Sequence, residues 1–320
     1  MLLLRLWPLT QQQPFSQPWA LAYPFAQILN IRPQQPEHNQ RLLRAVLRRQ
    51  HVLVLGGGGA RGFAHIGALA AMEELGLQDF DLVLGVSIGS LVATLLAFGH
   101  PAQRILQELE RVIIRARPYT FTLPRRSLFS LEPSRRALAA FFGDRQLQDG
   151  WLGLRCHSTN LSTNRHQAWL CGDIATAVIA SMSVPGIFPA VVDGAGQRHV
   201  DGGILNNLPI GAARRCSDGR VVAISLDPDP NSQPDPNSQP EPAPASASSA
   251  ASGAGLGRTI IDALMCGSHA AGQAEERLAD VLLRPDILRF PFLDWSQYRE
   301  IHGEGHRAAR QRLQHGWPAG

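Results

Sequence analysis

Gly85-Val86-Ser87-Ile88-Gly89 is the stretch around which the rest of the chain is organised. Residues 79–84 before it are typical of a short buried strand, and the apolar residues 90–98 after it are typical of a buried helix. Between a strand and a helix, a Gly-x-Ser-x-Gly pattern indicates a nucleophile elbow, a sharp turn that exposes the serine hydroxyl. A serine that only caps the helix, with incidental glycines, explains the five residues equally well. The choice depends on the rest of the chain.

Length and composition describe a globular protein of 320 residues, enough for one large α/β domain or two small ones. The apolar content of 44% is ordinary for a folded chain. The net charge is +4, and all 30 basic residues are arginines, spread without a long basic run. This pattern argues against nucleic acid as a partner, whereas a weak attraction to anionic lipid surfaces fits it.

The cysteines and the apolar runs bear on the cellular compartment. The four cysteines have no metal-ligand spacing, which favours a reduced compartment. No stretch contains eighteen consecutive apolar residues, so the sequence predicts no transmembrane helix. We therefore expect a cytoplasmic protein, with peripheral contact at the inner membrane surface as its closest association with a bilayer.

Composition divides the chain into four parts. Residues 1–50 are rich in Pro and Gln and predict a partly disordered N-terminal extension; an apolar membrane-surface anchor at its start is the alternative. Residues 51–226 form the predicted catalytic core. Residues 227–255 repeat Asp-Pro-Asn-Ser-Gln-Pro and then become rich in Ala and Ser, which indicates a flexible insertion. Residues 256–320 are predicted to be mainly helical and to complete the same domain.

A glycine-rich loop, residues 56–62, lies between a predicted strand at 51–55 and a predicted helix at 63–76. It matches a dinucleotide fingerprint, but no Gly-Lys-Ser/Thr follows that would make it a P-loop. The other interpretation is an oxyanion hole, because consecutive glycines expose backbone N–H groups at a helix N-terminus. We favour this interpretation. The next strand ends in the serine pentapeptide rather than in a ribose-binding acid, and neighbouring parallel strands share one crevice.

A third motif, Asp201-Gly202-Gly203, follows a short predicted strand at 198–200. Asp-Gly-Gly is a common hairpin turn, but a loop rich in Asn and Pro and then a helix at 210–215 follow here, not a second strand. The alternative is that Asp201 lies at a strand end beside Ser87.

The order and spacing of the three motifs resemble the patatin-like phospholipases, in their bacterial form. The neighbouring stretches 62–67, 180–189 and 205–209 resemble that family too. The resemblance covers residues 52–226 well and 256–315 more loosely. It implies an α/β, patatin-like three-layer fold with a mainly parallel central sheet and helices on both faces.

The resemblance also implies a function. It is that of a serine esterase that hydrolyses carboxylic ester bonds of lipids, of the phospholipase A or lysophospholipase type, through a Ser-Asp dyad and an acyl-enzyme. Ser87 would be the nucleophile and Asp201 the general base. The substrate would be a lipid or acyl ester, reached by transient contact with a membrane surface. No cofactor and no metal are implied.

The remaining site residues follow from the same resemblance. Arg61 would either hold the glycine loop or attract an anionic substrate. The implied oxyanion hole is Gly57, Gly58, Gly59, Arg61 and Gly62, and the elbow and motif glycines are Gly85, Gly89, Gly202 and Gly203.

Histidine must be weighed because most serine hydrolases use one. We interpret His65 as a structural core residue. His199 lies two positions before Asp201 and would face the same side, so a histidine-assisted triad is a minor alternative. A regulatory or adaptor protein with little turnover is the alternative function, and a dinucleotide-binding protein is a third.

Overall fold

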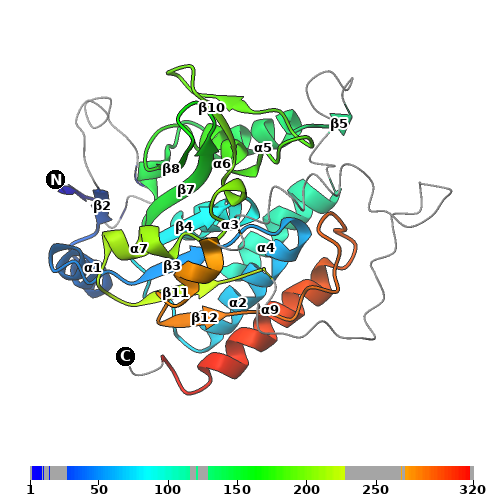
Figure 1. Ribbon diagram of the computed structural model, residues 1–320. Helices are drawn as coiled ribbons and strands as arrows, with labels where there is room; N and C mark the ends of the chain where they lie inside the picture. The colour runs from blue at the N-terminus through cyan, green and yellow to red at the C-terminus, as the bar shows by residue number, and fades with distance from the viewer. Residues whose placement is uncertain are drawn as a thin grey trace.

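The fold is taken from a computed structural model (Figure 1). The structure describes residues 2–8, 10, 14, 27–115, 120–121, 129–227, 268 and 271–317. The predicted low-complexity insertion, apart from Asp227, and most of the predicted helical stretch at 256–279 lie outside the described residues.

In the described part of the chain, eight strands form one central sheet in the order β12-β11-β3-β4-β7-β10-β9, with β8 also paired to β7. Strands β12, β11, β3, β4 and β7 are parallel to one another, whereas β8, β9 and β10 join antiparallel. The strands are β3 (Val52–Leu55), β4 (Leu82–Val86), β7 (Gly153–Asn160), β8 (Arg165–Trp169), β9 (Val191–Val192), β10 (Arg198–Asp201), β11 (Val221–Ile224) and β12 (Val281–Leu283).

Helices cover both faces of this sheet. In the described part of the chain the α-helices are α1 (Pro36–Val46), α2 (Phe63–Glu74), α3 (Ile88–Ala97), α4 (Ala102–Leu109), α5 (Glu132–Phe142), α6 (Ile174–Met182), α7 (Ile210–Cys216) and α9 (Tyr298–Leu313). Two smaller sheets pair β1 (Leu2–Leu6) with β2 (Gln27–Ile31), and β5 (Thr120–Phe121) with β6 (Phe129–Ser130).

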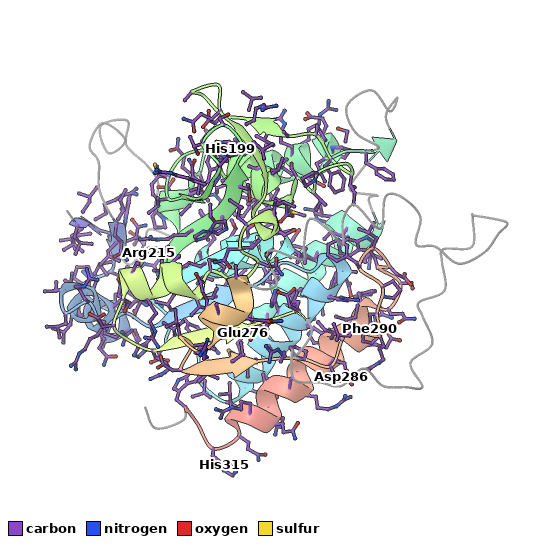
Figure 2. All side chains as sticks on the ribbon, viewed as in Figure 1. His199, Arg215, Glu276, Asp286, Phe290 and His315 are labelled. Carbon is purple, nitrogen blue, oxygen red and sulfur yellow. The ribbon has the colours of Figure 1, made fainter. Side chains whose placement is uncertain are left out.

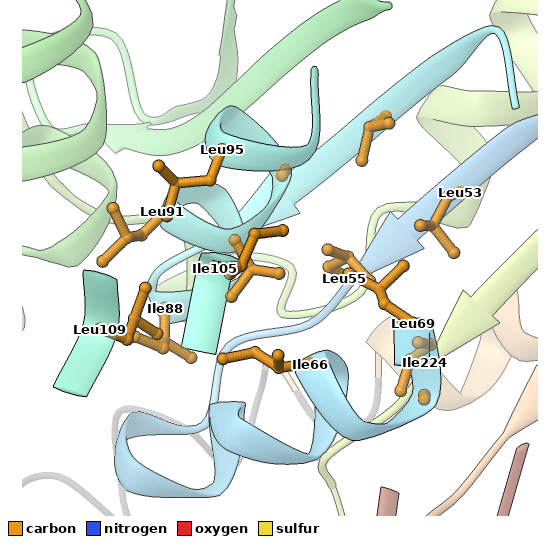
Figure 3. Packing of buried hydrophobic residues seen from close by; sticks show 14 of the residues in the cluster. Leu53, Leu55, Ile66, Leu69, Ile88, Leu91, Leu95, Ile105, Leu109 and Ile224 are labelled. Atoms are coloured by element: carbon orange, nitrogen blue, oxygen red, sulfur yellow. The ribbon is translucent and has the colours of Figure 1, made fainter. Parts of the chain in front are cut away.

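Alternate residues of the central strands supply two separate cores. Leu53 and Leu55 of β3 point into the larger core, to which α2, α3, α4, α5, α6 and α9 contribute (Figure 3). Val52 and Val54 point to the other face, into a smaller core beneath α7. Because successive side chains of a strand face opposite ways, a fully apolar strand requires cover on both sides. The predicted three-layer fold with a mainly parallel sheet is confirmed.

Helices α2 and α9 pack side by side across the larger core (Figure 1). Two glycines, Gly67 and Gly305, lie at their crossing, where an added Cβ would collide with the backbone of the opposite helix. Small residues let the two axes approach closely. The C-terminal helix is thereby fixed against the helix that follows the glycine loop.

Two elements differ from the sequence prediction. The strand expected at 79–84 begins only at Leu82, because the Asp81 carboxylate accepts hydrogen bonds from the Arg44 side chain, each at 2.7 Å, and from the His51 N–H. The sequence also predicts a single helix from Pro101 to Arg115, whereas the structure has α4 followed by a π-helical turn, Glu110–Arg115.

The N-terminal extension, for which the sequence predicts partial disorder and a short helix at about 38–49, contains β1, β2 and α1 in its described part. Arg5 forms an ion pair with Asp149 at 3.1 Å, and both side chains are buried. The Asn30 amide donates to the carbonyls of Gln148 and Gly150 at 2.9 and 2.7 Å. These contacts attach β1 and β2 to the loop before β7.

Candidate active site

Ser87 occupies a strained turn between β4 and α3. Its φ of 54° and ψ of −126° lie outside the regions that a side chain normally allows, at a cost of about 1–3 kcal/mol. A Cβ on Gly85 would lie 2.5 Å from Gly89 O, and one on Gly89 would meet the carbonyls of Leu55 and Gly56. Ser87 begins α3, but its side chain makes no capping hydrogen bond. The geometry is that of an elbow, and the helix-cap interpretation of the pentapeptide was wrong.

Two serines hold the backbone of this turn. The Ser87 N–H donates to Ser181 Oγ at 2.8 Å, and Ser181 Oγ donates onward to the His157 carbonyl at 2.6 Å. Ser90 Oγ donates to the Ser87 carbonyl at 2.7 Å. The strained conformation is therefore supported on both sides of Ser87, with the hydroxyl itself not used for that support.

Asp201 lies beside Ser87 because of the register of β10. This strand runs antiparallel to β7 and ends with Asp201 opposite Ser158, and Val86 of β4 lies opposite His157 on the same edge of β7, since β8 pairs with the other edge. One residue further along, Ser87 reaches the level of Ser158. The ends of β4 and β10 therefore meet at the same height of the sheet.

The Asp201 carboxylate is almost fully buried, with 4% of the residue exposed. Its Oδ1 accepts from the Gly203 N–H at 2.8 Å. Its Oδ2 has no hydrogen-bond partner of ordinary length among the described residues. A Cβ on Gly202 would lie 2.5 Å from the His157 carbonyl, so the strand end can approach β7 this closely only with glycine.

Burial raises the pKa of Asp201 to about 6, against the opposing effects of the Ser87 hydroxyl and the Gly203 N–H. The hydroxyl is thus near enough to act on the carboxylate, although Oδ2 makes no ordinary hydrogen bond. Catalytic hydrogen bonds are commonly poorly aligned before a substrate binds and tighten in the complex. A carboxylate with this pKa is a stronger base than one in water and is still ionised at neutral pH.

The glycine loop packs directly against the elbow. A Cβ on Gly57 would lie 3.0 Å from the Ser87 Cβ. The Gly57 N–H itself donates to Asn207 Oδ1 at 3.2 Å, and Asn207 Nδ2 donates back to Gly57 O at 3.0 Å. Among the described residues, the N–H groups of Gly58 and Gly59 have no acceptor. The N–H groups of Gly58 and Gly59 are therefore available to an oxyanion, whereas the N–H of Gly57 is already bonded to Asn207.

The far side of the loop is fastened to the segment before α9. The Ala60 N–H donates to Phe292 O at 2.8 Å. The Arg61 side chain donates to the carbonyls of Phe290 and Leu288 at 2.8 and 3.0 Å. Of the two functions considered for Arg61, the structure therefore shows the loop-holding one. The loop ends at Gly62, where a Cβ would collide with the side chain of Ile88.

The two histidines considered earlier both make structural contacts. His65 Nε2 lies 2.7 Å from Gly56 O, and burial lowers the pKa of His65 to about 4, so the ring is neutral and Nε2 donates. His199 contacts Ser158 Oγ through Nδ1 and Asp193 through Nε2, each at 3.1 Å. Figure 2 shows His199 in the β10 region, away from Phe290 beside α9. Both ring nitrogens of His199 are thus used elsewhere, which weakens the histidine-triad alternative.

An apolar pocket opens at Ser87 and encloses about 960 Å³, counting the space open to solvent at its mouth. Its walls come mainly from α3, α4 with the π-helical turn, α5, and the segments 182–188 and 292–295. The aliphatic and aromatic lining includes Leu91, Leu95, Leu138, Phe141, Phe142, Ile187 and Phe188. Such a cavity fits a hydrocarbon chain whose end lies at the serine.

Sequence reasoning missed two residues that shape the site, Asn207 and Ser181. Both fall within stretches that carried the family resemblance, but nothing in their neighbourhood indicated a contact 150 or 94 residues away. Both residues are buried and polar, and a buried polar side chain needs a hydrogen-bond partner. A polar residue within an apolar stretch, with no partner nearby in the sequence, is therefore the signal that could have identified them.

A family model described as patatin-like phospholipase matches residues 53–214. Patatin-like phospholipase domain-containing protein 6 of Mus musculus is 33% identical over 208 residues, which cover 63% of this chain and 15% of the relative. Lysophospholipase NTE1 of Kluyveromyces lactis is 28% identical over 288 residues, which cover 86% of this chain and 20% of the relative. Among solved structures, VipD of Legionella pneumophila is similar with a TM-score of 0.44 and 14% identity, over 84% of this chain and 67% of VipD.

The fold and the strained serine are those of a patatin-type α/β protein. The chain belongs to the patatin-like phospholipase family. This confirms the predicted resemblance, and the family's description agrees with the lipid ester hydrolysis that the motifs predicted. The chain spans a fifth or less of the length of these two curated relatives. Among the described residues, no helix has the length and apolarity needed to cross a membrane.

Proposed function

We propose that this chain hydrolyses the carboxylic esters of lipids, with Ser87 as nucleophile and Asp201 as general base. One observation carries the proposal. A serine in a strained elbow lies at the end of an apolar pocket and beside a buried carboxylate whose Oδ2 has no ordinary hydrogen bond among the described residues. Family membership and the name lysophospholipase of several relatives support the same activity.

In the first half of the reaction, Asp201 Oδ2 takes the proton from Ser87 as Oγ attacks the ester carbonyl. Negative charge develops on the carbonyl oxygen. The unengaged N–H groups of Gly58 and Gly59, together with the N-terminus of α3, are suited to stabilise it. Protonated Asp201 then gives its proton to the leaving alcohol, and an acyl-enzyme on Ser87 results.

In the second half, water takes the place of the alcohol. Asp201 accepts a proton from the water as it attacks the acyl carbonyl, and Ser87 recovers its own proton when the fatty acid leaves. The raised pKa of Asp201, about 6, suits both directions of transfer, because a base near neutrality can also serve as an acid. The apolar pocket would hold the acyl chain through both halves.

Lipid esters are presented at water–lipid interfaces, so we extend the proposal to transient contact with a membrane surface. The test uses purified full-length protein with a lysophospholipid and with a monoacylglycerol, measuring the release of free fatty acid. We expect turnover by the wild type and none by Ser87→Ala. Equal release by both proteins, or release by neither, would refute the proposal; the second outcome would favour the regulatory alternative.

A further inference from the structure

Two charged residues interrupt the apolar lining of the Ser87 pocket. Among its described lining residues, Glu108 and Arg111 alone carry a formal charge. The Glu108 side chain is 9% exposed, whereas the Arg111 side chain is 58% exposed. The carboxylate is therefore buried in the wall, and the guanidinium lies at the side that solvent reaches. This is where the polar part of a lipid would be left when its hydrocarbon chain fills the pocket.

Glu108 binds two arginines, so this cluster carries a net charge of +1. Its Oε1 lies 2.6 Å from Arg104 Nη2, and its Oε2 lies 2.9 Å from Arg111 Nε. The bond to Arg111 uses Nε only. Within the described part of the chain, the two terminal nitrogens of Arg111 have no acceptor. Glu108 thus fixes the Arg111 side chain while leaving its paired terminal donors available.

The backbone at Arg111 has the wide turn of a π-helix, over Glu110–Arg115. Glu110 is fastened by the Tyr298 hydroxyl, which donates to it at 2.9 Å. Five of the six residues from 108 to 113 line the pocket, more than one face of a regular α-helix could present. Single π-turns of this kind occur frequently at functional sites, and here the turn directs Arg111 to the pocket together with its apolar neighbours.

We propose that Arg111 binds the phosphate of a glycerophospholipid substrate and that Glu108 positions it. This inference rests on the proposed lipid esterase function and adds the residue that recognises the phosphate of the substrate. A guanidinium with two free terminal nitrogens matches the oxygens of a phosphate diester and forms charge-assisted hydrogen bonds with it. Because Arg111 and Ser87 line the same pocket, a substrate that carries both an ester and a phosphate can use both residues.

The test measures binding without turnover. Two ligands without an ester bond are titrated calorimetrically into the wild type, below their micelle concentrations: an ether-linked lysophosphatidylcholine and an ether-linked alkylglycerol of the same chain length. We expect Arg111→Gln to lower the preference for the phosphate-bearing ligand about ten- to hundredfold, the size of a charge-assisted bond. Arg111→Lys keeps the positive charge but loses the planar pair of terminal N–H donors, so it should retain part of that preference.

Arg104→Gln is the matched control. Arg104 pairs with the same carboxylate and has a similar exposure, 51%, but does not line the pocket. An equal loss of preference in Arg104→Gln would show that net charge matters and not the position of Arg111. An unchanged preference in Arg111→Gln, or an equal loss of affinity for both ligands, would also overturn the inference. Hydrolysis of the corresponding esters is scored separately, so failure of the esterase proposal is distinguished from failure of this one.

Discussion

The side chain of Asn207 and the peptide group of Gly57 bond to each other in both directions, with the Gly57 N–H donating to Oδ1 at 3.2 Å and Nδ2 donating to Gly57 O at 3.0 Å. The same Nδ2 also reaches the Asp227 carboxylate at 2.9 and 3.1 Å. Asn207 therefore fixes the start of the glycine loop, which must hold the neighbouring N–H groups still during the reaction.

We predict that Asn207→Asp lowers kcat about ten- to hundredfold, because the loop loses a buried hydrogen bond and a carboxylate faces Asp227. Asn206→Ala is the control, since among the described residues the Asn206 side chain bonds only within its own turn, where Oδ1 accepts from the Leu208 N–H at 3.0 Å. Steady-state kinetics on one soluble ester compares the two. An equal effect of both substitutions would mean that the 205–209 turn as a whole, and not the bond to Gly57, supports catalysis.

The pKa of Asp201 predicts how activity depends on pH. The base must be ionised, so kcat/KM should rise tenfold per pH unit below about pH 6 and level off above it. A profile that stays flat down to pH 4 would be incompatible with Asp201 as the base. Asp201→Asn should abolish turnover, because an amide cannot accept the proton.

His199→Ala is the companion variant for this test. It should lose stability, since the buried ring bridges Ser158 and Asp193, but retain the same pH profile at a temperature where it is folded. Near-normal turnover by Asp201→Asn with an inactive, folded His199→Ala would instead assign the proton transfer to histidine.

The raised pKa of Asp201 also predicts that the active site costs stability. The folded state holds this proton up to about pH 6, whereas the unfolded chain loses it near pH 3.8. The contribution of Asp201 to the free energy of unfolding is therefore largest below pH 3.8, decreases as the pH rises to about 6, and remains low above that. Relative to Asp201→Asn, the wild type should lose up to about 3 kcal/mol across this window. Urea unfolding of both proteins at pH 4 and pH 8 measures the change; a constant difference would contradict it.

The backbone strain at Ser87 can be tested with two inactive variants. Ser87→Gly relieves the positive φ, whereas Ser87→Ala keeps a Cβ there, so we expect the glycine variant to be more stable by about 1 kcal/mol or more. Thermal unfolding compares them. A fluorophosphonate should label the wild type at Ser87 and neither variant; modification of a different serine, found by mass spectrometry, would remove Ser87 as the nucleophile.

Most of the fold could be predicted from local patterns. The small and apolar residues 174–182 and the Pro185 that follows predict a helix at the observed bounds of α6, and the structure adds an Asp173 cap at its N-terminus, bonded to the Thr176 N–H at 2.7 Å. The continuous apolar runs of β3 and β11 predicted apolar, buried strands. The π-turn after α4 could not be predicted, since its anchor, Tyr298, lies 188 residues away.

The candidate site was predictable in its residue types but not in its contacts. The motifs named Ser87 and Asp201, yet their proximity depends on the register of β10 against β7, which no short pattern encodes. The assignment of Gly57 as an oxyanion donor changed for a similar reason, because its N–H is taken by an asparagine 150 residues later. Contacts between residues far apart in the sequence thus determine which backbone N–H groups of the glycine loop remain free to bind an oxyanion.

The anchoring of the glycine loop to residues 288–292 determines where this chain can be shortened. The stretch that matches the family model ends at residue 214, but three carbonyls beyond it, together with strand β11 between β3 and β12, hold the loop and the sheet in place. A fragment cut where the family model ends would contain every motif and still lack the contacts and the strands β11 and β12 that hold them in place. The smallest autonomous unit therefore extends through α9, about a hundred residues beyond the end of the family model.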